Sequence, residues 1–358
     1  MKELKKELET HLRAILEKNV GLRRDQKIIL LYDENCTLSQ LLACGYRTVL
    51  GSYTFEEFLG KKVFTKLLGF LGGDNFESII FNEEKSAQIK EKLLGLVRGD
   101  VAILVQSSSF RLSEFRIRLD LNNNGVLVLE HNHLDKIKED EIETYVHALT
   151  YEYDYYKKMC DLATPMLAKA AEVRIISSDG SLMRYTGPFD IVYYNIGDFT
   201  KSLGSFYPIG EFFTEPLNLT SVNGTFSVYA YPDSKHVTQV GAPFKVVIKE
   251  GHIVEHEGPE RFAQILDLIK TENEDGQIWI REMGFGLNRF IGRNAVLSYV
   301  GAHERQCGFH VSMGLKHGIY RKKVSSKINQ RFHIDMFIDV AQIWIDDDLI
   351  FEKGKYLG

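Results

Sequence analysis

Short, almost wholly apolar segments recur through the first half of the chain and restrict its fold more than any other feature. They lack the polar alternation of a strand that is exposed on one face. A strand is apolar on both faces when helices cover both sides of its sheet, which is typical of parallel sheets. The expected strands are residues 27–32, 48–50, 78–81, 101–105 and 126–129.

Segments with apolar residues at helical spacing lie between and around these strands. Residues 1–19 predict a charged amphipathic helix, and residues 55–71 and 86–97 predict two more. A long acidic and aromatic helix is expected over residues 138–171, with Pro165 kinking or restarting it. This alternation predicts an N-terminal α/β domain with a mainly parallel sheet.

The pattern changes near residue 172. Residues 173–176 and 182–185 flank a Ser-Asp-Gly turn and predict a β-hairpin, and glycine-punctuated extended segments follow. A length of 358 residues fits two domains at about 150 residues each. We predict an N-terminal α/β domain over residues 1–172 and a C-terminal α+β, metal-binding catalytic domain over residues 173–358.

Composition narrows the class of partner and the compartment. The chain is 44% hydrophobic and 26% charged with a net charge of -5, so no basic surface favours nucleic acid or an anionic membrane. The four cysteines are widely spaced and form no CxxC pair, which indicates a reducing compartment and no structural zinc knuckle. The sequence has neither a signal-peptide pattern nor an apolar run of about 20 residues, so we expect a cytoplasmic protein.

Acids and histidines lie beside glycines or turns in four phrases of the second half. A strand directs residues two apart to the same face, so an imidazole and a carboxylate at positions 333 and 335 would converge. Carboxylates and imidazoles without thiolates suit Zn, Co, Mn or Fe(II). Taken singly, a glutamate before glycine is also typical of a solvated turn, and a strand histidine of a hydrogen-bonded core. The candidate ligands are Glu211, Glu282, His310, His333 and Asp335.

The order of these phrases, GEFFTEP, EMGFGLN, GFHVSMG and HIDM, resembles the aminopeptidase T family of metallopeptidases. The likeness runs from about Pro208 to the C-terminus. It implies an N-terminal α/β domain, a C-terminal domain with a two-metal centre of Zn, Co or Mn, a homodimer, and removal of N-terminal residues from a peptide substrate. It also implies that the five residues named above are the metal ligands.

The sequence differs from the family pattern at two catalytic positions. The family has an acid a few residues before the first histidine, and Glu304 is the candidate, one residue further away than expected. A tyrosine is expected about seven residues after that histidine, where this chain has His317, with Tyr320 three residues later. Glu282 or Glu304 is the predicted acid–base, and Tyr320 or His317 the predicted oxyanion donor.

Two other functions stay open on the sequence. The 2,5-dihydroxypyridine dioxygenases share the fold implied by the resemblance and use a single Fe(II), with a histidine in place of the second glutamate; Glu282 favours hydrolysis instead. A non-catalytic binding protein on the same fold is the third hypothesis, because the tyrosine position differs. His131 and His133, which follow an expected strand, are interpreted as part of a polar loop.

Overall fold

The structure is a computed structural model that describes residues 2–64, 77–80, 83–112, 116–271, 276–315, 320 and 333–358. The chain divides into two compact units. The first unit consists of Met1–Tyr153 and Asn195–Ile209, and the second of Asp154–Tyr194 and Gly210–Gly358. The chain thus leaves the first unit and returns to it once. The boundary at residue 172 stays a prediction.

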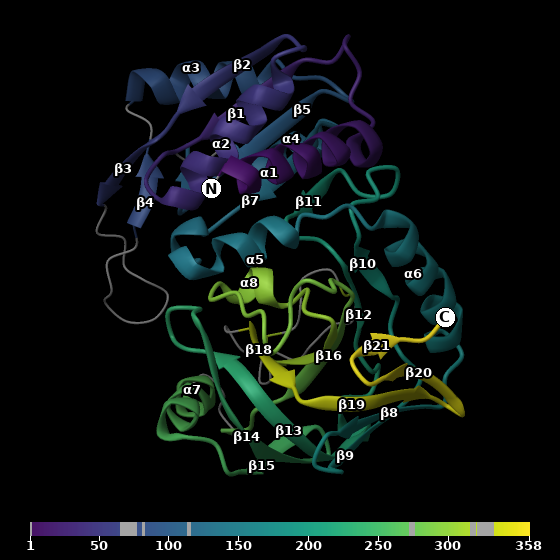
Figure 1. Ribbon diagram of the computed structural model, residues 1–358. Coiled ribbons are helices and arrows are strands. Elements are labelled where there is room, and N and C mark those ends of the chain that lie inside the picture. Colours follow the sequence, from purple (N-terminus) through teal and green to yellow (C-terminus); the bar gives the residue numbers. More distant parts are fainter. Residues whose placement is uncertain are drawn as a thin grey trace. The chain divides into compact units, whose positions relative to one another are not determined.

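A parallel sheet forms the centre of the first unit (Figure 1). Neighbouring strands of this sheet are all parallel. In spatial order its described strands are β11 (Gly204–Phe206), β7 (Leu127–His131), β5 (Val101–Val105), β1 (Ile28–Tyr32) and β2 (Phe55–Leu59). Every residue of β1, β5 and β7 is buried, so the prediction of a mainly parallel sheet covered on both faces is confirmed.

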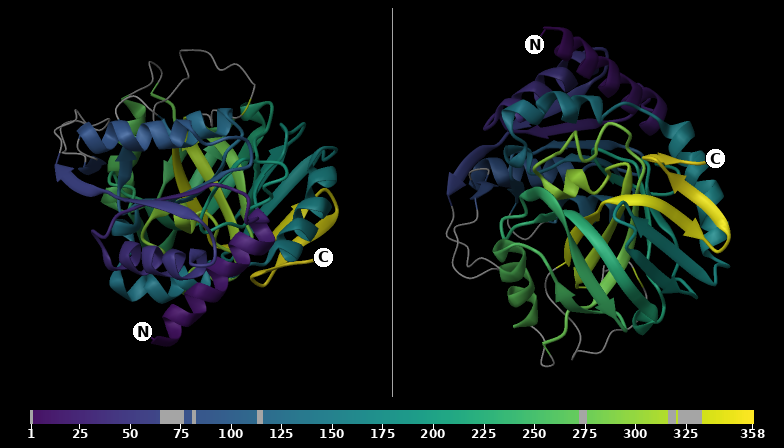
Figure 2. Two further views of the ribbon diagram at one scale, coloured as in Figure 1. Left: turned by 90° about the horizontal axis from the view of Figure 1, so that it is seen from above. Right: turned by 60° about the horizontal axis from the view of Figure 1, so that its bottom comes forward.

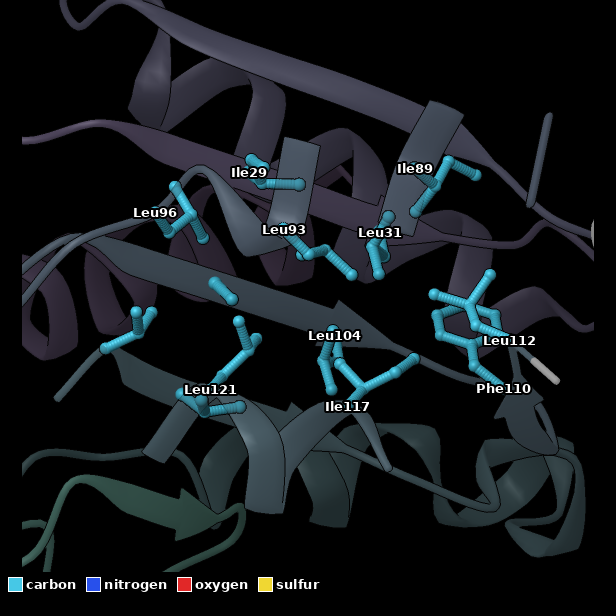
Figure 3. Close-up of a cluster of buried hydrophobic side chains, with 13 residues drawn as sticks. Ile29, Leu31, Ile89, Leu93, Leu96, Leu104, Phe110, Leu112, Ile117 and Leu121 are labelled. Carbon is cyan, nitrogen blue, oxygen red and sulfur yellow. The ribbon is translucent and has the colours of Figure 1, made fainter. Parts of the chain in front are cut away.

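Helices cover both faces of this sheet (Figure 2, left). One face carries α3 (Glu83–Leu94) and α4 (Ile117–Asn123); the other carries α1 (Lys2–Ala14), α2 (Thr37–Leu50) and α5 (Ile142–His147). Figure 3 shows the first of these interfaces, where side chains from two helices and from strands β1, β5, β7 and β6 (Ser109–Arg111) pack into one apolar cluster. Ile29 and Leu31, two apart on β1, point into it together, as the period of a strand requires.

Two expected elements of the first unit are wrong. Residues 48–50 continue α2 instead of forming a strand, because Tyr46, Val49 and Leu50 extend the buried face of that helix. Residues 55–59 form the edge strand β2 instead of starting a helix over 55–71. Phe55, Phe58 and Leu59 have helical spacing in the sequence, which led to the expectation of a helix there. The end of that expected helix lies outside the described residues.

A separate three-stranded sheet also belongs to the first unit. It contains β3 (Lys61–Phe64), β4 (Glu77–Ile80) and β6 (Ser109–Arg111). The strand expected over 78–81 is therefore present, but outside the main sheet. The long helix expected over 138–171 is broken into α5 and α6 (Tyr153–Leu167), and Pro165 lies inside α6.

The second unit is built on a large, curled, mainly antiparallel sheet (Figures 1 and 2). The fold class predicted from the sequence, a parallel α/β part followed by an α+β part, is confirmed. Along the sheet the described strands are β10 (Tyr193–Asn195), β12 (Glu211–Thr214), β16 (Ile280–Gly286), β17 (Gly308–Gly314), β18 (His333–Ile338), β13 (Val222–Pro232), β9 (Leu182–Thr186), β8 (Glu172–Ser177), β19 (Val340–Ile345), β20 (Asp348–Glu352) and β21 (Lys355–Tyr356).

Further elements complete the second unit. β14 (Thr238–Lys249) pairs with β13 and with β15 (His252–His256), and α7 (Glu260–Lys270) and the short α8 (Val300–His303) precede β16 and β17 respectively. The predicted hairpin is confirmed as β8 and β9, which pair antiparallel. None of the helices in the described ranges has both the length and the apolar composition needed to cross a membrane.

Candidate metal centre

Strand register places the candidate ligands on one face of the large sheet. Residues directly opposite in an antiparallel pair share a face, as do residues two apart on a strand. Glu211 lies opposite Gly286, and His310 lies opposite Gly284, two residues from Glu282. Asp335 lies opposite Ser312, two residues from His310, and His333 lies opposite Gly314. Four strands therefore present all five side chains to the same side.

Small residues between the ligands give these side chains room. A Cβ added at Gly284 would lie 2.0 Å from both Cε1 and Nε2 of His310. The imidazole of His310 therefore packs directly over the backbone of β16. On the other face of the same strands, Phe212 and Phe285 stack with ring centroids 4.6 Å apart. The alternation thus puts an apolar core on one face and the charged cluster on the other.

Glu211, Glu282 and His310 form the tightest group. Each is buried and offers a ligand atom, and these atoms all lie within 4.8 Å of one another. Oε1 of Glu211 is 3.5 Å from Nε2 of His310. Burial lowers the pKa of His310, which favours the neutral imidazole that metals bind.

His333 and Asp335 form a second pair beside this group. Nε2 of His333 is 3.4 Å from Oδ1 of Asp335, and Nδ1 of His333 is 3.1 Å from the carbonyl of Leu315. Burial alone would lower the pKa of His333, but Asp335 and then Glu282 raise it to about 10. Burial likewise opposes ionisation of Asp335, yet His333 holds the pKa of that carboxyl at about 2. Without a metal, the two therefore exist as an ion pair.

Glu282 is a buried acid whose pKa is raised toward neutral pH. Burial is the main cause, reinforced by Glu211 and Asp335 and opposed by His333, and it raises the pKa of Glu282 to about 8. The buried hydroxyl of Tyr320 donates a hydrogen bond to Oε2 of Glu282 over 3.4 Å. Burial and Glu282 also raise the pKa of Tyr320, so that hydroxyl keeps its proton.

Glu304 and Arg305, at the end of α8, extend the cluster. Nη1 of Arg305 is 2.9 Å from Oε2 of Glu211 and also contacts Oε2 of Glu304. Burial raises the pKa of Glu304 well above its usual range, against the lowering effect of Arg305. Arg305 was not among the candidates from the sequence, because an arginine next to a glutamate is typical of a solvated surface. Only its burial, at 6% exposure, distinguishes it.

The structure therefore brings together most of the residues singled out from the sequence. Glu304 and Tyr320 lie with the five candidate ligands, whereas His317 lies outside the described residues. Glu215 is a further buried acid, and its charge also raises the pKa of Glu282. Glu215 lies in the phrase GEFFTEP but was not among the candidate ligands from the sequence. The roles of all these residues stay predictions.

The donor set fits a divalent cation. Nδ1 of His310 is buried and has no hydrogen-bond partner among the residues that the structure describes, and Oδ1 of Asp335 is buried against Nε2 of His333. A buried polar atom normally needs a partner, because its desolvation is costly. Oxygen and nitrogen donors without thiolates match the preferences of Zn, Mn, Co and Fe(II). The cluster is thus a candidate site for a divalent cation.

The solved structures that share this fold include two enzymes, although no protein-family model and no curated protein sequence matches the chain. One is the 2,5-dihydroxypyridine dioxygenase of Pseudomonas putida, with a TM-score of 0.60 and 15% identity over 99% of this chain and 96% of that one. The other is AmpT of Thermus thermophilus, with a TM-score of 0.62 and 11% identity over 99% of this chain and 100% of that one. At these identities the likeness shows a common fold.

Proposed function

We propose that this protein is a metal-dependent aminopeptidase, which hydrolyses the first peptide bond of a peptide substrate. The observation that carries the proposal is the position of Glu282. It shares a tight group with Glu211 and His310, its pKa is about 8, and the hydroxyl of Tyr320 lies against it. The phrases that resemble aminopeptidase T and the fold shared with AmpT support the same class.

The chain supplies the ligands and the acid–base groups. Glu211, Glu282 and His310 would hold a divalent ion of Zn, Co or Mn, with His333 and Asp335 close by. When bound, such an ion polarises the scissile carbonyl and lowers the pKa of water. The family resemblance implies two ions and a homodimer.

Proton transfer is assigned to Glu282. Its carboxylate, beside the hydroxyl of Tyr320, would accept a proton from the attacking water and return it to the leaving amine as the carbon–nitrogen bond breaks. Glu304, whose pKa is also raised, is the second candidate. Tyr320 keeps its proton and would donate a hydrogen bond to the oxyanion that forms at the carbonyl carbon.

The test is Glu282→Gln, assayed on a panel of unblocked dipeptides and tripeptides with Zn, Co or Mn added. Loss of the general base should lower kcat by about 10²- to 10⁴-fold without unfolding the protein. Glu130→Gln is a matched control, because Glu130 is a buried carboxylate of the first unit whose pKa burial also raises. Peptide hydrolysis at the wild-type rate by Glu282→Gln would refute the assignment.

A second function, an Fe(II) ring-cleaving dioxygenase, is favoured by one specific observation. His310, His333 and Asp335 form a set of two histidines and one carboxylate on adjacent strands, a combination that suits non-haem iron. The fold shared with the dihydroxypyridine dioxygenase supports it. Oxygen uptake by the iron-loaded protein with dihydroxylated pyridines, without peptide hydrolysis, would favour this function. A protein that binds no metal and has neither activity would be the non-catalytic alternative.

A further inference from the structure

Arg305 is a buried cation inside the carboxylate cluster. Its side chain is 7% exposed, and Nη1 lies 2.9 Å from Oε2 of Glu211 and in contact with Oε2 of Glu304. A guanidinium is always protonated, so one positive charge is fixed among these acids. Such a charge is costly to bury unless carboxylates surround it, as they do here.

The backbone around Arg305 holds this charge in place. The carbonyl of Arg305 accepts a hydrogen bond of 2.9 Å from the amide of Asn288. A Cβ added at Gly286 would lie 2.0 Å from the carbonyl oxygen of Gln306 and 2.9 Å from the carbonyl carbon of Arg305. Strand β16 therefore packs directly against the main chain of residues 305 and 306. With its backbone fixed and its side chain buried, Arg305 has little freedom to withdraw from Glu211.

The two carboxylate oxygens of Glu211 face different partners. Oε1 lies 3.5 Å from Nε2 of His310, whereas Oε2 lies 2.9 Å from Nη1 of Arg305. In a two-metal centre, a bridging carboxylate directs one oxygen to each ion. Glu211 has this divided arrangement, but the partner of one oxygen is a guanidinium. A second divalent ion at that oxygen would meet a like charge at close range.

We infer that Arg305 occupies the place of a second cation on Glu211, so that the centre binds one divalent ion per chain. This inference rests on the proposed metal-dependent function and departs from the two ions implied by the family resemblance. The single ion would lie on the side of Glu211 that faces His310 and Glu282. Arg305 is a positioning residue, because it orients Glu211 and fixes the charge of the site without being a metal ligand.

The experiment counts bound ions directly. Metal-free full-length protein is dialysed to equilibrium against Mn²⁺ or Zn²⁺ alone, and the bound metal is measured by mass spectrometry. We expect one ion per chain for the wild type and for Arg305→Lys, which keeps the charge. We expect two ions for Arg305→Glu, which replaces the cation by a carboxylate, and for Arg305→Met if the glutamate variant does not fold.

Arg293→Glu is the matched control. Arg293 makes a 3.0 Å ion pair with Asp339, and its side chain is 46% exposed, so reversing its charge should leave one ion per chain. Two ions in the wild type would overturn the role of Arg305 and leave the metal-dependent function standing. One ion in both wild type and Arg305→Glu or Arg305→Met would also overturn it. No ion in the wild type would overturn the metal centre itself, and the inference with it.

Discussion

Each unit of this protein buries a cluster of polar side chains, and the two clusters differ in kind. In the first unit, His131 is fully buried among three tyrosines. Its Nε2 lies 2.7 Å from the hydroxyl of Tyr46, its Nδ1 lies 2.9 Å from the hydroxyl of Tyr145, and its ring stacks on Tyr207 at 5.3 Å. Burial lowers the pKa of His131 to about 3, so the imidazole is neutral.

The hydrogen bonds of this first cluster close on themselves. The hydroxyl of Tyr145 donates a hydrogen bond of 3.1 Å to the carbonyl of Tyr207. The same hydroxyl must therefore accept the hydrogen bond from Nδ1 of His131. Nε2 of His131 is then the acceptor for Tyr46. Each polar atom of the histidine has a partner without any ion. The sequence-based interpretation of His131 as part of a polar loop is wrong, because the residue ends β7 in the core.

The second unit buries charges instead of neutral groups. Glu211 and Asp335 lie with Arg305 and two histidines, and Oδ1 of Asp335 pairs with Nε2 of His333. Burial therefore does not distinguish a structural cluster from a functional one. The two clusters differ in whether protein groups satisfy the buried atoms: both ring nitrogens of His131 have partners, whereas Nδ1 of His310 has none among the described residues.

Tyrosine hydroxyls give the largest expected contrast between the clusters. Tyr320→Phe should lower kcat by about 10²- to 10³-fold with little change in thermal stability, because it removes the proposed oxyanion donor. Tyr145→Phe removes a hydroxyl of the first cluster and should cost about 1–3 kcal/mol of stability with kcat unchanged. Peptidase assays and thermal unfolding of both variants measure the contrast. Equal effects on kcat would contradict it.

Substitution of Gly284 should have the next largest effect. A Cβ at this position would meet the ring of His310 at 2.0 Å, so Gly284→Ala should displace the imidazole and weaken metal binding by about 10- to 100-fold. Isothermal titration with Zn²⁺ measures the affinity. Gly241→Ala is the control, since a Cβ there meets nothing within 4 Å. Unchanged zinc affinity in Gly284→Ala would remove His310 from the ligand set.

The pH dependence of stability tests the first cluster. The folded-state pKa of His131 is about 3 against an ordinary value of 6.5, so the unfolded chain binds more protons between these values. The contribution of neutral His131 to the free energy of unfolding is complete above about pH 6.5. It falls as the pH drops, by up to about 1.4 kcal/mol per pH unit. His131→Phe should unfold more easily at pH 7 but lose less stability between pH 6 and 4. Urea unfolding across that range measures the slope, and a slope equal to that of the wild type would count against a neutral His131.

Local pattern predicted the elements that tertiary contacts do not alter. The apolar runs of β1, β5 and β7 and the hairpin of β8 and β9 are present as expected. The errors fall where context overrides the pattern. Residues 48–50 have strand-like composition but complete a buried helix face, and residues 55–59 have apolar side chains at helical spacing but pair with β1 as an edge strand.

The sequence by itself determined the fold class and one feature of the site. The side-chain period of a strand is enough to put His333 and Asp335 on the same face. Tertiary structure alone decided that Glu211, Glu282 and His310 meet them, because that requires the register of β12, β16, β17 and β18. It also decided that Arg305 is buried against Glu211. Strand periodicity acts between near neighbours, whereas register and burial depend on packing between segments far apart in the chain.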